Sequence, residues 1–138
     1  MTTPPQPPPP PPPPGGAATP PPGYANNEEK TWALVAHFGG AVGIFLLSGV
    51  GGWIGPLVAL LAKGNESPTV RAHAVEALNF QLTWSIVGVI GWATMCIVIG
   101  FLILPVAVLM GIIFGIIAGV RANEGALYRY PASVKMIK

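Results

Sequence analysis

The chain has 138 residues, which is room for one domain at most. Only 9% of its residues are charged and 51% are hydrophobic, with a mean hydropathy of +0.59, whereas a soluble domain carries about a quarter charged residues. No Asp, Glu, Lys or Arg occurs from Thr31 to Ala62 or from Ala77 to Val120, and both runs exceed the roughly 18 residues that indicate a membrane span. The composition therefore excludes an ordinary soluble domain and predicts an all-α integral membrane protein. The net charge of +2 is too small to indicate nucleic acid as a partner.

Residues 1–27 form a proline-rich tail that contains thirteen of the seventeen prolines and no charged residue. Such chain adopts extended polyproline II and has no means of building a packed core, so we expect a disordered, semi-rigid tail. An alternative is a docking strip for a cytoplasmic partner with an aromatic-lined groove. The tail lacks the basic start and apolar stretch of a signal peptide, so we do not expect cleavage.

The first uncharged run is too long for a single upright span. As one helix its 32 residues would extend about 48 Å, against a hydrocarbon core of about 30 Å. Glycines and a proline interrupt it, which predicts a helix over Glu28–Leu47, a turn at Ser48–Gly52 and a short helix over Trp53–Lys63. We favour a membrane-buried hairpin, which returns the chain to the same side, and a single pass is the alternative.

The next join contains recognisable helix signals. Lys63 stands where a cation meets the end of the short helix, and Gly64 has the position of a left-handed residue past that end. Ser67 is predicted to cap a third helix that begins at Pro68.

The second uncharged run is long enough for two spans. We predict a tight turn at Gly100–Leu102 and a final helix over Ile103–Asn123, so that the second hairpin crosses the membrane fully. Cys96, the only cysteine, is expected to be buried within this hairpin. The predicted fold is a compact four-helix bundle with a broken first hairpin, in a membrane domain over residues 28–123.

The cations are unevenly placed along the chain. Two lie in the 63–71 loop and four lie beyond the last span, whereas the predicted turn near Gly100 has none. The positive-inside bias therefore places the 63–71 loop and a C-terminal tail over residues 124–138 in the cytoplasm. With a hairpin in the first run, the N-terminus is cytoplasmic too, and the protein is a multi-pass component of the cytoplasmic membrane.

The start of the third helix carries a polar face made of His73, Glu76, Asn79 and Thr83, which fall within an arc of about 120°. In one interpretation Glu76 pairs with Arg71 or a lipid headgroup and Asn79 bonds a neighbouring helix. In a second interpretation the face lines a water-filled path or contacts a ligand. A third, weaker one adds His37 to His73 and Glu76 as metal ligands.

Small residues recur every four positions along the final helix. They form a ridge that lets another helix approach closely, and it consists of Ala107, Gly111, Gly115 and Gly119. We favour packing within the chain, and a homo-oligomer through this ridge is the alternative.

Several segments resemble a family of small bacterial membrane proteins of unknown function, which is distantly similar to the small Tic subunit of the chloroplast inner-envelope import machinery. The resemblance covers Glu28 to Pro131 and includes "WALVAHFGG" and "GPLVALLAKGNESP". The residues that stand as in the family's two motifs, besides those of the polar face, are Ala77, Leu78, Phe80, Gln81, Tyr128, Arg129, Tyr130 and Pro131. Gln81 lies off the polar face. The resemblance implies a four-helix membrane fold and, by analogy, a role in protein translocation.

These observations predict a structural or accessory component of the cytoplasmic membrane whose proline-rich tail binds a partner. The alternative is a channel or translocation component. We expect no enzyme and no cofactor, and we assign no catalytic or metal residue, because the sequence shows no nucleophile–base pair and no paired carboxylates at working distance.

Overall fold

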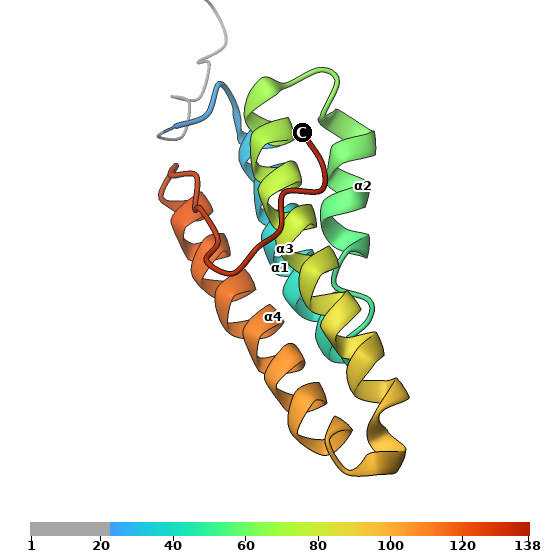
Figure 1. Ribbon diagram of the computed structural model, residues 1–138. Helices are drawn as coiled ribbons and strands as arrows, with labels where there is room; N and C mark the ends of the chain where they lie inside the picture. Colours follow the sequence, from blue (N-terminus) through green and yellow to red (C-terminus); the bar gives the residue numbers. More distant parts are fainter. Residues whose placement is uncertain (1–22) are drawn as a thin grey trace, which may run out of the picture.

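The computed structural model describes residues 23–138. This part of the chain consists of helices joined by irregular segments and contains no strands. Its four α-helices pack side by side (Figure 1). They are α1 (Asn27–Leu46), α2 (Ile54–Lys63), α3 (Pro68–Ala93) and α4 (Gly100–Asn123). The prediction of four helices with a short second one is confirmed. The predictions for the proline-rich tail, disorder or docking of a partner, concern residues 1–27, most of which lie outside the described residues.

The α1–α2 hairpin forms where the glycines and proline predicted it. Asn26 caps α1 by accepting the N–H of Glu29 at 2.9 Å. The turn after α1 contains Ser48 at φ +47° and Gly49 at φ +94°, a backbone that glycine adopts without the cost a side chain adds. Gly55 of α2 lies so close to the backbone of α1 at Gly39 that a Cβ there would overlap it.

The start of α3 also follows its local signals. Ser67 accepts the N–H of Val70 at 3.1 Å and Pro68 occupies the first turn, as predicted. The Ser67 hydroxyl additionally donates to Glu29 at 2.5 Å, which joins the starts of α1 and α3. The expected left-handed Gly64 is wrong, because its φ is −63° and the chain continues with right-handed backbone.

The turn between α3 and α4 lies earlier than predicted. It spans residues 94–99 and includes a short 3-10 helix, η1 (Met95–Ile97). Gly100, expected within the turn, is instead the first residue of α4, where it packs against the backbone of Gly91 and Met95 too closely for a Cβ. Cys96 therefore lies at the exposed tip of the hairpin, and its predicted burial is wrong.

Small side chains bring the helices together. A cluster of fully buried alanines surrounds Phe80 of α3, which is itself fully buried. The predicted ridge of α4 packs against α1 of the same chain: Cβ atoms added at Gly111 and Gly119 would overlap Ile44 and the Phe38 ring, and one at Gly115 would lie 2.9 Å from the Ala41 Cβ. This close approach leaves no space for larger side chains along the ridge.

The two hairpins differ in length (Figure 1). The α1–α2 turn lies beside the last turns of α3, where Gly88 packs against Gly49 and the Trp92 indole N–H donates to the Ser48 carbonyl at 3.0 Å. Since Gly88 precedes the end of α3 by five residues, the α3–α4 hairpin extends beyond the α1–α2 turn by roughly 8 Å.

Two helices are long and apolar enough to cross a membrane by length and composition. They are α3, with a mean hydropathy of 1.2 in its most apolar window, and α4, with 2.8. α2 is apolar but shorter, and α1 is not among the two. Two candidate spans within an all-helical fold are thus present.

Candidate functional site

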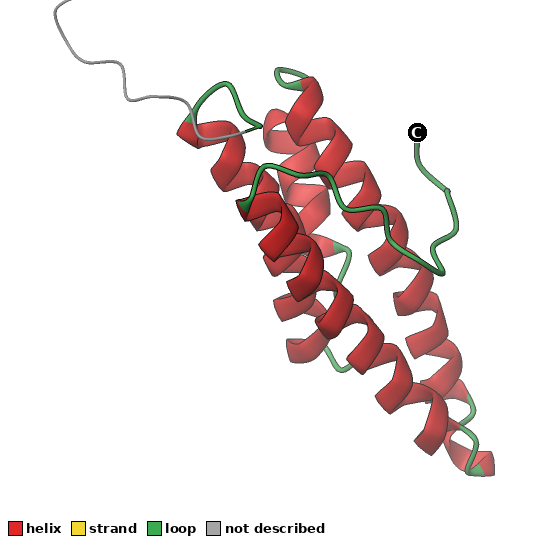
Figure 2. Ribbon diagram, turned by 90° about the vertical axis from the view of Figure 1, so that its left-hand side faces the viewer, coloured by secondary structure: helices red, strands yellow, loops and turns green. Residues whose placement is uncertain are grey.

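The C-terminal segment, residues 124–138, folds back over the polar face of α3 (Figures 1 and 2). Asn79 holds it with three hydrogen bonds: its amide N–H donates to the Ile137 carbonyl at 2.8 Å, and its oxygen accepts the N–H groups of Met136 and Ile137 at 2.8 and 2.6 Å. The Thr83 hydroxyl accepts the Val134 N–H at 3.0 Å. Asn79 therefore bonds the C-terminal segment rather than a neighbouring helix.

Glu76 is buried under the same segment. Its side chain is 8% exposed and its Oε1 accepts from Arg129 at 3.2 Å and from Lys135. The expected partner Arg71 instead donates to the Lys138 main-chain oxygen at 3.0 Å. Because the cations come from a segment with no helical periodicity, the helix pattern of the sequence gave no signal for this pairing.

His73, at one edge of the predicted face, points into the bundle and belongs to a row of four buried aromatic side chains. We call this row the histidine–tyrosine chain; it consists of Tyr24, His73, His37 and Tyr130. The Tyr24 hydroxyl lies 3.4 Å from His73 Nε2, His73 Nδ1 lies 3.0 Å from His37 Nε2, and His37 Nδ1 lies 2.8 Å from the Tyr130 hydroxyl.

The donors and acceptors of the chain have one consistent arrangement for neutral rings. The Tyr24 hydroxyl donates to the Ala122 carbonyl at 2.6 Å, so it accepts from His73 Nε2–H. His73 Nδ1 then accepts from His37 Nε2–H, and His37 Nδ1 accepts the Tyr130 hydroxyl proton, since a neutral imidazole has one donor and one acceptor. Every hydrogen bond therefore points in the same direction.

Both hydroxyls are protonated at neutral pH, as this arrangement requires, and burial shifts their pKa values further upward. It raises the pKa of Tyr24 to about 12, with a contribution from Glu29, and it also raises the pKa of Tyr130. The histidine–tyrosine chain can relay a proton only if all four groups reverse the direction of their hydrogen bonds. In the arrangement described, it connects four segments: the approach to α1, α1 itself, α3 and the C-terminal segment.

The weakest of the three interpretations of the polar face, a metal site at His37, His73 and Glu76, does not match the arrangement of these side chains. His37 and His73 follow one another in series with a tyrosine at each outer nitrogen, and Glu76 faces the C-terminal cations instead. Within residues 23–138, no group of three His, Cys, Asp or Glu side chains is placed to hold a metal ion.

Gln81 is a buried polar residue that the predicted face missed. It is fully buried on the other side of α3, and its amide N–H donates to the Gly111 carbonyl at 3.2 Å. Cβ atoms added at Gly40, Gly52 or Gly111 would meet its amide, so glycines of α1, the α1–α2 turn and α4 create the space it fills. The sequence feature that could have identified Gln81 as a site residue was its position in the second half of "HAVEALNFQ".

The remaining motif residues serve mainly as packing. Ala77, Leu78 and Phe80 are buried, and Phe80 stacks on the Tyr130 ring with centroids 4.2 Å apart. Tyr128 packs edge-on against Tyr130 at 5.3 Å. The two motifs, far apart in sequence, thus meet in the aromatic stack and in the Arg129–Glu76 ion pair.

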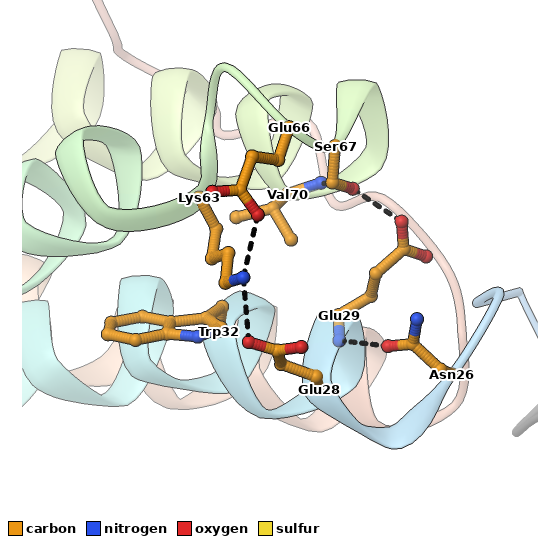
Figure 3. A pocket seen from close by; sticks show the side chains of 8 residues that line it. All are labelled: Asn26, Glu28, Glu29, Trp32, Lys63, Glu66, Ser67 and Val70. Atoms are coloured by element: carbon orange, nitrogen blue, oxygen red, sulfur yellow. Dashed lines mark hydrogen bonds and ion pairs between the residues drawn. The ribbon is translucent and has the colours of Figure 1, made fainter.

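The α2–α3 loop closes onto the start of α1 through ion pairs (Figure 3). Lys63 lies 2.9 Å from Glu28 and 2.7 Å from Glu66, and Trp32 lines the small polar hollow beside it. With the C-terminal segment, this places the charged groups of the described residues near one end of the bundle, which we call the charged end.

Comparison with known proteins identifies the family. The sequence model described as the magnetosome magnetite crystal formation protein family matches residues 28–137, most of the chain. No curated protein and no solved structure matches the chain. The predicted similarity to the small Tic subunit is not supported. The residues outside the match are almost all in the proline-rich tail, so the matched part includes all four helices and the C-terminal segment. The chain belongs to the magnetosome magnetite crystal formation protein family.

Proposed function

We propose that this protein is a multi-pass component of the cytoplasmic membrane with a structural or accessory role. The observation that carries the proposal is the separation of its surface: charged side chains gather at one end, and apolar side chains cover the helices elsewhere.

The apolar surface, which we call the apolar belt, is too exposed for a core. Only 22% of the most apolar window of α4 is buried within the chain, against 56% for α3. Soluble monomers rarely expose contiguous apolar surface on this scale. The belt includes these residues that are at least 45% exposed: Val42, Phe45, Leu46, Ile86, Val89, Ile90, Phe101, Leu102, Val106, Leu109, Ile113 and Ile116.

The lengths of the helices fit a bilayer. From Gly100 to Val120 α4 has no charged residue, which is about 30 Å of helix and the thickness of a hydrocarbon core. We propose that α3 and α4 span it and that the α1–α2 hairpin enters from the same side and turns inside. Irregular backbone survives there only where protein covers it, and Gly88, Leu104 and Val108 lie against the turn at Gly49.

The charged end is proposed to face the cytoplasm because the cations of the 63–71 loop and of residues 124–138 gather there. The family description supports an accessory role in crystal formation at a membrane. The same proposal includes a partner that the proline-rich tail binds, and it includes no catalytic activity.

Two measurements test the proposal. The protein is expected to stay in membranes washed with alkaline carbonate and to leave them only with detergent. Crosslinking in native membranes is expected to capture a protein partner through residues 1–27, and deletion of these residues is expected to abolish that crosslink. Release by carbonate alone, or the same crosslinks without the tail, would contradict the proposal.

A channel or translocation role is the second candidate, because the histidine–tyrosine chain lies inside the bundle. Against it, the glycine contacts of α3 beyond Ser85 are with apolar residues: Gly88 packs on Gly49 of the α1–α2 turn, and Gly91 packs on Leu104 of α4. The protein alone in liposomes is therefore expected to conduct no ions. Reproducible conductance that changes with Glu76→Gln would favour the channel.

A further inference from the structure

The C-terminal segment gathers cations beside α3. We call this group the cationic patch; it consists of Arg71, Arg129, Lys135 and Lys138. It contains four of the seven Lys and Arg residues of the chain, and the contacts that assemble it are those of Arg71 with the Lys138 main-chain oxygen and of Arg129 and Lys135 with Glu76.

The carboxylate side chains around the patch leave most of its positive charge uncompensated. Glu76 is its one side-chain carboxylate contact among the described residues, because Glu28 and Glu66 pair with Lys63 and Glu124 pairs with Arg121. The Arg129 side chain is 76% exposed and uses one nitrogen on Glu76. Its other N–H groups therefore face outward, free for an anion.

Beside the cations lies a hollow of about 280 Å³ with two kinds of lining. Its charged rim is formed by Arg71, Arg129, Lys138 and Glu76, and its apolar floor by Pro68, Ala72, Val75 and Leu127. Apart from Leu127 of the C-terminal segment, this floor is on α3 just before Ala77, where the uncharged run begins. The hollow thus joins positive charge to apolar surface at the proposed membrane boundary.

We propose that the cationic patch binds the phosphate of an anionic phospholipid, with Arg71 and Arg129 as the main contacts. A guanidinium presents paired N–H donors that match phosphate oxygens, and basic pockets at the cytoplasmic side of spanning helices suit lipid headgroups. The apolar floor accommodates the glycerol and upper acyl chain, which a free phosphate lacks. The inference rests on the proposed membrane embedding and adds the class of lipid.

The test uses the purified full chain in detergent, with fluorescent short-chain phosphatidylglycerol and phosphatidylcholine as probes. Phosphatidylglycerol is expected to bind at least about tenfold more tightly, since its net negative charge is attracted by both guanidinium groups. The double variant Arg71→Gln/Arg129→Gln is expected to lose this preference and to bind phosphatidylcholine as before.

The matched control is Lys30→Gln/Arg121→Gln, which removes the same charge from the charged end outside the patch and is expected to keep the preference. Thermal unfolding of both variants confirms that they fold. Equal binding of the two lipids by the native chain, or loss of preference in the control as well, would overturn the site. Complete displacement of phosphatidylglycerol by inorganic phosphate would assign the patch to free phosphate instead. A protein that resists carbonate extraction yet shows no lipid preference contradicts this inference alone, whereas extraction by carbonate contradicts the proposed function itself.

Discussion

The two halves of α3 are parts of one continuous helix, but the first half has buried polar side chains and the second half has exposed apolar ones. In the first half His73 and Asn79 are 3% and 0% exposed and each has defined hydrogen-bond partners. In the second half Ile86 and Val89 are 51% and 56% exposed. The buried side chains of the first half therefore depend on specific partners, whereas the outward face of the second half, at Ile86 and Val89, depends only on being apolar.

In the membrane setting that we propose, this contrast explains how so small a protein forms a defined structure. Apolar side chains give helices little reason to associate there, because lipid tails are as apolar as leucine. Defined structure then depends on close contacts of small residues and on polar groups with few alternative partners. Both devices are concentrated where α3 meets α1, α4 and the C-terminal segment.

The largest effect is expected from Gly115→Leu. Its side chain would displace α1 at Ala41 and the amide of Gln81, and overpacking of this kind costs about 3 kcal/mol. Because the ridge contacts the same chain, the loss of stability in detergent is expected at every protein concentration. Ile113→Leu, on the exposed side of α4 (47%), is the control and is expected to unfold like the native chain. A Gly115→Leu monomer of native stability that has lost a crosslinked oligomer would place the ridge between copies.

Asn79→Leu is expected to release the C-terminal segment. It removes three hydrogen bonds, and its loss is expected to be about 2 kcal/mol because the freed main-chain groups regain some water. Tryptic cleavage after Lys135 in detergent is expected to accelerate at least about tenfold. Ile86→Ala, which changes only the exposed half, is expected to leave the cleavage rate unchanged. Equal rates in the two variants would mean that the segment is held by other contacts.

A smaller effect is expected from Tyr130→Phe. The ring remains stacked on Phe80, but His37 Nδ1 loses its donor, which costs about 1 kcal/mol for a buried acceptor. Tyr128→Phe is the matched control, because the Tyr128 hydroxyl makes no hydrogen bond within the described residues. Thermal unfolding in detergent compares them, and equal melting temperatures would show that the histidine–tyrosine chain does not stabilise the fold.

Local signals predicted the helices well. Ser67 and Pro68 act within one turn of helix, so their effects can be inferred from neighbours in the sequence. Gly100 and Gly64 were misassigned because glycine serves both turns and close helix contacts. Only the approach of the Gly91 and Met95 backbone distinguishes these uses at Gly100.

The candidate site was less predictable because it joins distant segments. The polar face of α3 was recognised by its periodicity, but its cover comes from residues 129–138, which have no periodicity of their own. Tyr24 and Tyr130 meet the histidines across 49 and 93 positions. Gln81 was not assigned to the polar face because it is a single polar residue on an otherwise apolar face of the helix. Its role becomes clear only when the positions of the glycines opposite it are known.

Cysteine accessibility tests the central claim of a charged end in water and an apolar belt in lipid. In a background without Cys96, Asn65→Cys and Ala126→Cys introduce exposed thiols at the charged end, and Ile113→Cys introduces one in the belt. With membrane-impermeant maleimide, the first two are expected to be shielded in intact cells and to react together in inverted membrane vesicles, whereas the third reacts only after detergent is added. Reaction of Ile113→Cys in vesicles as fast as Asn65→Cys would contradict the claim, because a belt that meets water is not in the bilayer.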